Sequence, residues 1–133
     1  MKNRWIESEA AAIAGEGDDL GLRVYTSQLL GGDADLVLHG GGNTSVKGEL
    51  QNVFGEMESV LFVKGSGWDL RTIQSAGFPA VKMDYLLRLG QLDTLSDSEM
   101  MRQLRLALLD PTAPTPSVEA ILHALIPHKY VDH

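Results

Sequence analysis

Two apolar runs that each end in a glycine-rich loop constrain the fold of this chain most strongly. Residues 59–64 contain an uninterrupted run of valine, leucine and phenylalanine, and they lead into Gly65-Ser66-Gly67. The shorter run 36–39 leads into Gly40-Gly41-Gly42. Runs of β-branched and aromatic residues bounded by glycine are typical of strands. The sequence therefore predicts two strands, each followed by a loop of the same chemical kind.

Helices and shorter strands account for much of the remaining chain. Apolar residues with a helical period predict a helix over 20–30, and Gly31-Gly32 ends it. Ser96 and Glu99 form a capping box for a helix over 97–109. The other expected elements are extended chain over 43–47 with a turn opening at Gly48, a helix from Asp69 to residue 75, a strand over 80–84, a helix over 85–89, a helix over 118–126 capped by Ser117, and a strand beginning at 130–133. This order predicts an α/β (α+β-like) domain with a central mixed sheet covered by helices.

Composition narrows the class of protein. The 133 residues fit one domain, and the net charge of −7 argues against nucleic-acid or acidic-membrane partners, which are polyanions. The absence of cysteine excludes disulfides, thiolate metal sites and thiol catalysis. Neither a secretory signal nor an apolar run of about 20 residues is present, so we expect a soluble cytoplasmic protein. Backbone N–H groups still allow an anionic small molecule to bind.

Two well-known kinds of glycine-rich site do not match this sequence. His39-Gly40-Gly41-Gly42 is similar to the oxyanion-hole run of lipase-like hydrolases, which also need a Gly-x-Ser-x-Gly nucleophile elbow. Ser66 has Lys64 and Trp68 where that elbow needs glycine. The chain also lacks the Gly-Lys-Ser/Thr of a P-loop and the Gly-x-Gly-x-x-Gly of dinucleotide-binding folds. Hydrolase and nucleotide-binding functions are therefore disfavoured.

The remaining polar candidates allow two interpretations when each is taken alone. Glycine, serine and asparagine loops can direct backbone N–H groups and hydroxyls toward an anion, but glycine serves simple tight turns equally well. Glu119 begins a predicted helix, where a solvated glutamate is favoured by the helix dipole. His123 lies one helical turn later, and a shared solvated face explains the pair without any function. His128 is expected to be exposed, and His133 allows no interpretation by itself.

The order of four motifs resembles the class II aldolase/adducin family. These motifs are Gly42-Asn43-Thr44-Ser45, Lys64-Gly65-Ser66-Gly67, Pro116-Ser117-Val118-Glu119 and Tyr130-Val131-Asp132-His133. The resemblance covers the chain from about residue 20 and is greatest to aldolase domains of the rhamnulose-phosphate aldolase/alcohol dehydrogenase type. It implies a central, mainly antiparallel sheet flanked by helices, and a homo-oligomer, usually a tetramer. A C-terminal dehydrogenase domain in the full-length protein is compatible with it.

The resemblance also implies a role for each matching residue. Gly42 and Asn43 match the family's first phosphate loop, Ser66 and Gly67 the second, and Ser117 the third, so we expect the two glycine loops and Ser117 to meet in space. Glu119 matches the catalytic acid/base, and His133 matches the first of three histidines that hold a divalent metal, commonly Zn²⁺. The other two histidines have no counterpart. We therefore expect residues 1–133 to be the truncated N-terminal portion of one such domain, inactive alone.

The implied reaction is metal-dependent cleavage of a ketose 1-phosphate, such as rhamnulose 1-phosphate, to dihydroxyacetone phosphate and an aldehyde. Such cleavage leaves an enediolate that suits a Lewis-acidic metal, a carboxylate that moves the proton, and an anchored phosphate. Val118 stands where several members have a second hydroxyl residue, which leaves the sugar phosphate open. The alternatives are a noncatalytic adducin-like assembly module, or an epimerase or other lyase of the same family. Glu119 and His133 favour an enzyme.

Overall fold

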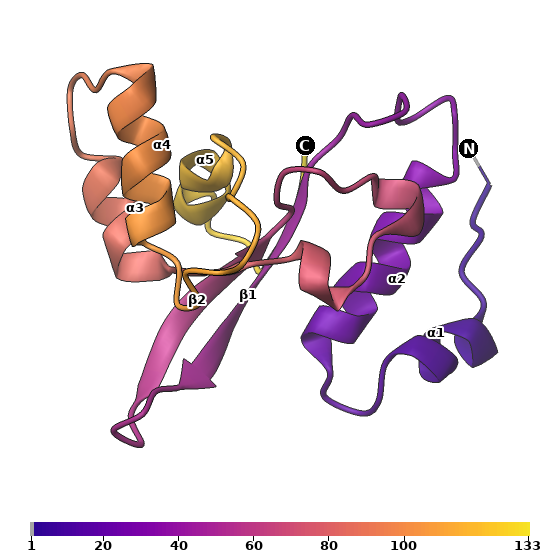
Figure 1. Ribbon diagram of the computed structural model, residues 1–133. Coiled ribbons are helices and arrows are strands. Elements are labelled where there is room, and N and C mark those ends of the chain that lie inside the picture. Colours follow the sequence, from indigo (N-terminus) through magenta and orange to yellow (C-terminus); the bar gives the residue numbers. More distant parts are fainter. Residues whose placement is uncertain (1) are drawn as a thin grey trace.

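The computed structural model describes residues 2–133 and shows one sheet between two groups of helices (Figure 1). The four strands of this described part are β1 (Thr44–Gln51), β2 (Met57–Val63), β3 (Ala80–Lys82) and β4 (Tyr130–Asp132). Their order across the sheet is β3-β2-β1-β4, and every neighbouring pair is antiparallel. The expected mainly antiparallel sheet flanked by helices is therefore confirmed, and the expectation of a mixed sheet is wrong.

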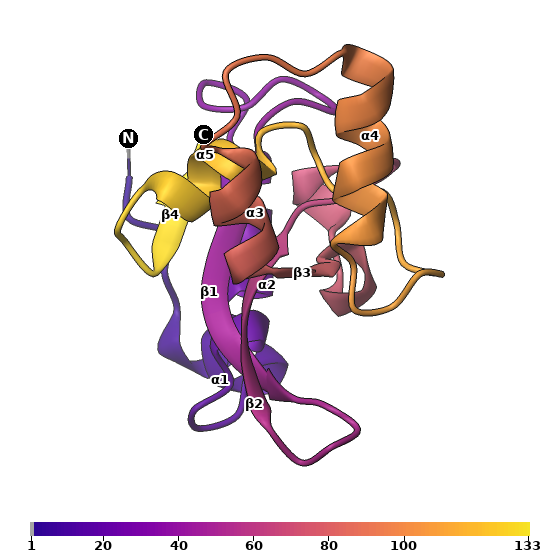
Figure 2. The ribbon, with the colours of Figure 1, turned by 90° about the vertical axis from the view of Figure 1, so that its left-hand side faces the viewer.

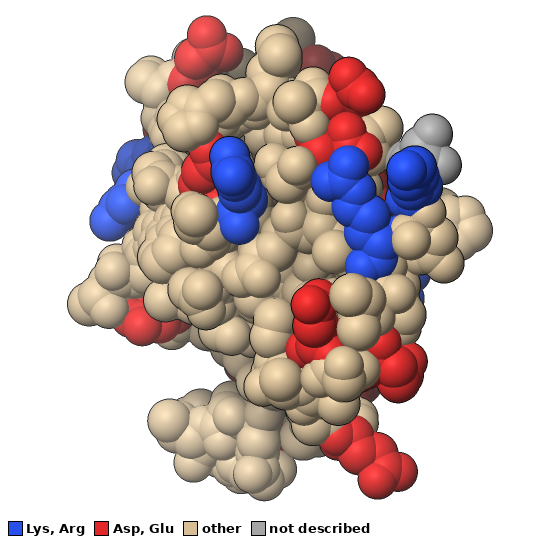
Figure 3. Space-filling view, turned by 90° about the vertical axis from the view of Figure 1, so that its right-hand side faces the viewer, with Lys and Arg blue, Asp and Glu red and all other residues tan. Residues whose placement is uncertain are grey.

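Helices cover both faces of the sheet. The helical elements are α1 (Glu7–Ile13), α2 (Asp19–Gly31), the 3-10 turns η1 (Leu70–Thr72) and η2 (Ser75–Gly77), α3 (Met83–Leu89), α4 (Asp97–Leu106) and α5 (Ala120–Leu125). α1, α2 and the two 3-10 turns lie on one side, and α3, α4 and α5 lie on the other (Figures 1 and 2). On the α1 and α2 side, acidic and basic side chains are interspersed over the surface (Figure 3).

Alternation along β2 divides the buried side chains between two cores. Leu61 and Val63 point to the side of α3, α4 and α5, where they pack with Leu86 and Leu104. Phe62 points to the opposite side and packs on the cluster of Val24, Leu70, Ile73 and Phe78. Successive side chains of a strand face opposite sides of a sheet, so a continuous apolar run can fill both cores. This requirement explains the uninterrupted pattern of residues 59–64.

Two expected caps, Ser96 and Asp69, are confirmed by hydrogen bonds. Ser96 Oγ accepts from the Glu99 N–H at 3.3 Å at the start of α4, and Asp69 accepts from Arg71 N–H at the start of η1. α4 ends at Leu106, before the expected residue 109, because residues 107–109 instead bond to β3. The helix expected from Asp69 to residue 75 is replaced by the two short 3-10 turns.

Two expectations around the first glycine loop are wrong. Residues 36–39 form turns and irregular chain without a strand partner, and Leu38 is 82% exposed. Gly48 lies inside β1 and opens no turn. A Cβ atom at this position would stand 3.2 Å from the Phe62 ring. The chain reverses later, where Asn52 accepts two backbone N–H bonds and Gly55 has a φ of +79°. Gly48 therefore makes room for a cross-strand aromatic side chain.

None of the helices within residues 2–133 is both long enough and apolar enough to cross a membrane.

The core between the sheet and α4 predicts different effects for two leucines of the same helix. Leu104 is fully buried, whereas Leu106 is 53% exposed. We expect Leu104→Ala to lower the free energy of unfolding by about 2–5 kcal/mol, because it leaves a cavity. Leu106→Ala, the matched control, is expected to lower it by about 0.5 kcal/mol or less. Urea unfolding followed by circular dichroism measures both values, and equal losses would contradict the packing described.

Candidate functional site

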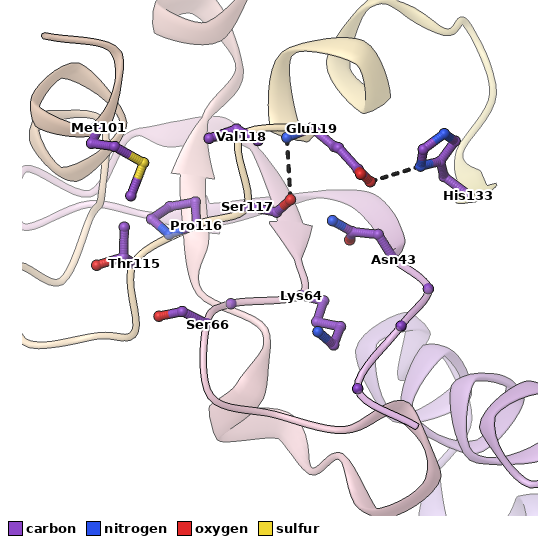
Figure 4. Close-up of a pocket in the computed structure, with 14 residues that line it drawn as sticks. Asn43, Lys64, Ser66, Met101, Thr115, Pro116, Ser117, Val118, Glu119 and His133 are labelled. Carbon is purple, nitrogen blue, oxygen red and sulfur yellow. Dashed lines mark hydrogen bonds and ion pairs between the residues drawn. The ribbon is translucent and has the colours of Figure 1, made fainter. Parts of the chain in front are cut away.

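A pocket of about 570 Å³ lies where the start of β1, the end of β2 and the start of α5 meet (Figure 4). Its lining residues are Gly40, Gly41, Gly42, Asn43, Lys64, Gly65, Ser66, Met101, Thr115, Pro116, Ser117, Val118, Glu119 and His133. The expected meeting of the two glycine loops with Ser117 is therefore confirmed. Gly67 does not line the pocket; it follows Ser66 in the turn with a φ of +85°.

The pairing of β1 with β4 positions Asn43 and His133. The N–H of Asn43 donates to the carbonyl of His133, and the N–H of His133 donates to the carbonyl of Asn43, both at 2.7 Å. Directly opposed residues of an antiparallel pair place their side chains on the same face. Asn43 is 5% exposed, and its Oδ1 is buried without a hydrogen-bond partner in the described part of the chain. A buried unpartnered acceptor beside a pocket is suited to a polar ligand.

A close backbone approach brings Ser66 and Ser117 to the pocket. The N–H of Ser66 donates to the carbonyl of Thr115 at 2.9 Å, and the N–H of Ser117 donates to the carbonyl of Lys64 at 3.4 Å. Gly65 lies between these contacts, and a Cβ atom there would stand 2.7 Å from the side chain of Pro114. Glycine at this position thus permits the two segments to touch.

Glu119 and His133 form a hydrogen-bonded pair at the pocket wall. His133 Nδ1 lies 2.7 Å from Glu119 Oε2, and both side chains are partly exposed. The Glu119 N–H donates to Ser117 Oγ at 3.1 Å, but α5 begins only at Ala120, so Ser117 is not the N-cap of the helix that was expected over 118–126. An ionised carboxylate only accepts hydrogen bonds, so Nδ1 carries the hydrogen and a neutral ring keeps a lone pair on Nε2. Carboxylate-held imidazoles of this kind are typical metal ligands.

Lys64 is a pocket residue to which the sequence interpretation gave no role. It follows the last residue of β2 and lines the pocket together with Asn43, Ser66 and Ser117. Among the lining residues, its ammonium group and the carboxylate of Glu119 are the groups with a fixed charge. The sequence signal was present, because a lysine directly before a Gly-Ser-Gly loop brings positive charge to that loop.

The solvated face that the sequence predicts for His123 is wrong, because the side chain of His123 is fully buried. Its Nδ1 lies 2.7 Å from Ser45 Oγ, which is buried as well. Burial lowers the pKa of His123, and the neighbouring His133 and Lys47 act in the same direction, against the attraction of Glu119 and Asp132. A buried imidazole of lowered pKa stays neutral at physiological pH. His128 is exposed, as expected.

A divalent metal fits this pocket only in part. Within residues 2–133, no group of three histidine, aspartate or glutamate side chains is arranged to hold a metal ion. The donor set consists of the His133 imidazole, with the Glu119 carboxylate on its other ring nitrogen. This arrangement provides one oriented ligand of the three that the resemblance implies.

The comparisons with known proteins agree with this architecture. No family model matches the chain. The N-terminal class II aldolase domain of a conserved protein from Thermoplasma acidophilum is 44% identical, with a TM-score of 0.89, over all of this chain and 59% of its own. The uncharacterized oxidoreductase YuxG of Bacillus subtilis (strain 168) is 38% identical over 133 residues, which are 19% of its length. The chain is therefore similar over its whole length to a class II aldolase domain, and it spans only part of the length of either relative.

The contact at Gly65 predicts a position-specific effect of alanine. We expect Gly65→Ala to lower the free energy of unfolding by about 1–3 kcal/mol, because the added methyl group overpacks against Pro114. Gly15→Ala is the matched control, since a Cβ atom there meets nothing within 4 Å. Urea unfolding measures the difference between the two variants. A Gly65→Ala protein as stable as Gly15→Ala would show that the two segments do not touch as described.

Proposed function

We propose that this chain is part of a metal-dependent aldolase that cleaves a ketose 1-phosphate, such as rhamnulose 1-phosphate, to dihydroxyacetone phosphate and an aldehyde. The observation that carries the proposal is the meeting of a carboxylate–imidazole pair with hydroxyl, amide and lysine groups in one pocket. The carboxylate–imidazole pair suits proton transfer beside a metal, and the hydroxyl, amide and lysine groups suit the binding of a phosphate. The similarity to a class II aldolase domain supports a lyase activity.

The phosphate is proposed to bind at the Asn43, Ser66 and Ser117 end of the pocket, beside Lys64. Ser66 and Ser117 offer hydroxyl groups to the phosphate. Gly42 has a φ of +76° and leaves its backbone accessible, whereas a Cβ atom at this position would collide with the side chain of Leu70. Lys64 supplies the positive charge that the chain as a whole, with a net charge of −7, does not have. Binding the phosphate holds the reacting carbons of the sugar at the other end of the pocket. Gly67 is proposed to shape the Ser66 turn.

Glu119 is the proposed acid/base. Its Oε2 is hydrogen-bonded to His133, and no hydrogen bond to Oε1 is formed by the residues described. One oxygen therefore orients the carboxylate while the other can accept or return a proton of the substrate. The Glu119 backbone is fixed by Ser117, which we propose as a phosphate ligand, so the proton-transfer group and the phosphate anchor are two residues apart.

His133 is the residue of this chain that would hold the metal, through Nε2. The metal, for which Zn²⁺ is proposed, supplies positive charge that stabilises oxygen anions of the substrate. The other two ligands would come from outside residues 2–133, consistent with the greater length of the solved relative. We further propose a cytoplasmic homo-oligomer, in which residues 1–133 are the N-terminal portion of the aldolase domain. The name and length of the B. subtilis relative support a dehydrogenase domain after it.

The proposed roles of Glu119 and His133 predict separable effects in the protein expressed from its complete gene. Glu119→Gln preserves size and hydrogen bonding but removes the proton-accepting carboxylate. We expect it to keep the bound metal and to lower kcat by about 10²–10⁴-fold. His133→Ala is expected to lower the metal content itself, because one of three protein ligands is lost. Elemental analysis and a coupled assay on rhamnulose 1-phosphate measure both. A Glu119→Gln protein with full metal content and normal kcat would exclude the acid/base role.

The proposed phosphate site predicts a binding defect when Lys64 loses its charge. We expect Lys64→Met to raise KM for the ketose 1-phosphate by about 10–100-fold, since hydrogen bonds to charged groups contribute about 1.5–3 kcal/mol. Lys82→Met is the control, because Lys82 is exposed on β3 outside the pocket. Steady-state kinetics on the complete protein give the comparison. An unchanged KM in Lys64→Met would place the phosphate elsewhere.

A further inference from the structure

We propose that His123 is a positioning residue that holds the imidazole of His133 in the orientation in which it meets Glu119. The inference deepens the proposed function, because it assigns a role to a buried side chain behind the proposed metal and acid/base pair. It rests on the geometry of the described residues, in which the two rings and the carboxylate lie together.

The position of His123 is fixed from three directions. Its Nδ1 is hydrogen-bonded to Ser45 Oγ on β1 at 2.7 Å, and both residues have no exposed surface. Its backbone N–H donates to the carbonyl of Glu119 at 3.1 Å, within the first turn of α5. Its carbonyl accepts from Lys47 Nζ at 2.9 Å, again on β1. The ring therefore has the fixed position that a support for a neighbouring side chain requires.

His123 contacts His133 through the two imidazole rings. The His123 and His133 ring centroids are 6.3 Å apart, and the ring planes are nearly perpendicular at 83°, which is the edge-to-face arrangement that aromatic pairs prefer. His133 is 55% exposed and follows a strand of three residues, so its own surroundings restrict it weakly. Glu119 at Nδ1 and His123 at the ring together define its orientation (Figure 4 shows the Glu119 contact).

The second nitrogen of His123 argues against a role in stability alone. Its Nε2 is buried and makes no hydrogen bond to any residue that the structure describes. A buried polar atom without a partner lowers stability, so an apolar side chain of similar size would be the better core residue. Such unsatisfied groups call for an explanation, and functional sites are where they are tolerated. Here the ring lies beside the pair proposed to carry the reaction.

Two substitutions in the protein expressed from its complete gene separate the ring contact from the hydrogen bond. His123→Phe keeps a ring against His133 but loses the bond to Ser45, whereas His123→Asn keeps a polar partner for Ser45 but loses the ring. We expect His123→Asn to lower the affinity for Zn²⁺ alone by about tenfold, measured by competition with a chromophoric chelator. We expect His123→Phe to restore most of it. His128→Asn, an exposed position outside the pocket, is the matched control and is expected to bind Zn²⁺ normally.

A second measurement does not depend on metal or turnover. Imidazole ¹⁵N shifts of His133 in the metal-free protein report which ring nitrogen carries hydrogen, and we expect a single Nδ1–H form in the unaltered protein. In His123→Asn the two forms are expected to mix. Should the histidine variants not fold, Ser45→Ala removes only the anchoring hydroxyl and is expected to produce the same mixing more weakly.

The outcomes distinguish this inference from the proposed function. An unaltered protein that binds no Zn²⁺ and cleaves no sugar phosphate would exclude the proposed function, while the His133 spectra would still test the positioning role. Spectra of His133 that are the same in His123→Asn, Ser45→Ala and the unaltered protein would overturn the inference. A lower melting temperature in His123→Asn with unchanged Zn²⁺ affinity and spectra would show that His123 is only structural.

Discussion

The antiparallel pairing of β1 with β4 decides where the candidate site lies. It joins the residue before β1 to the last residue of the chain, through the two 2.7 Å bonds between Asn43 and His133. A strand of three residues gives little pairing by itself, and α2 secures it. Buried Arg23 binds Asp132 at 2.6 Å, and burial lowers the pKa of Arg23 against the raising effect of that carboxylate. Removing one partner of such a pair leaves an uncompensated buried charge, so the pairing is specific.

The register of β1 then distributes the polar side chains between the two faces. Ser45 and Lys47 point toward α5, where they bind the imidazole and the carbonyl of His123. Thr44, the residue before Ser45, points toward α2, and its Oγ1 lies 2.7 Å from Ser27 Oγ. Because side chains alternate along a strand, a shift of one residue would exchange these sets. His133 follows the same rule as the partner of Asn43, which places it on the α5 face beside Glu119.

Much of the fold could be predicted from local sequence signals, whereas the neighbours of the site residues could not. The β2 run and the Ser96 cap depend on adjacent residues, so the pattern sufficed. The strand predicted over residues 36–39 is absent because a run of only three apolar residues, followed by His39, forms a strand only where a partner strand is present. Local sequence predicts a solvated His123, whereas the side chain is buried against Ser45, which belongs to a distant segment of the chain. The predicted meeting of Asn43, Ser66 and Ser117 came from the order of motifs in a resembling family, and loop chemistry alone left simple turns equally open.

The charge arrangement of the pocket follows from the same topology. Lys64 follows β2 and Glu119 precedes α5, and the backbone contacts between residues 64–66 and 115–117 bring the two segments together. A carboxylate beside a proposed phosphate site would repel the phosphate if the two shared one end of the pocket. The bond from His133 directs the carboxylate toward β4, while Lys64 follows β2, which lies on the other side of β1. The hydrogen bond between His133 and Glu119 thus has two consequences. It orients the imidazole of His133 for the proposed metal, and it holds the negative charge of Glu119 near β4, away from Lys64, which follows β2.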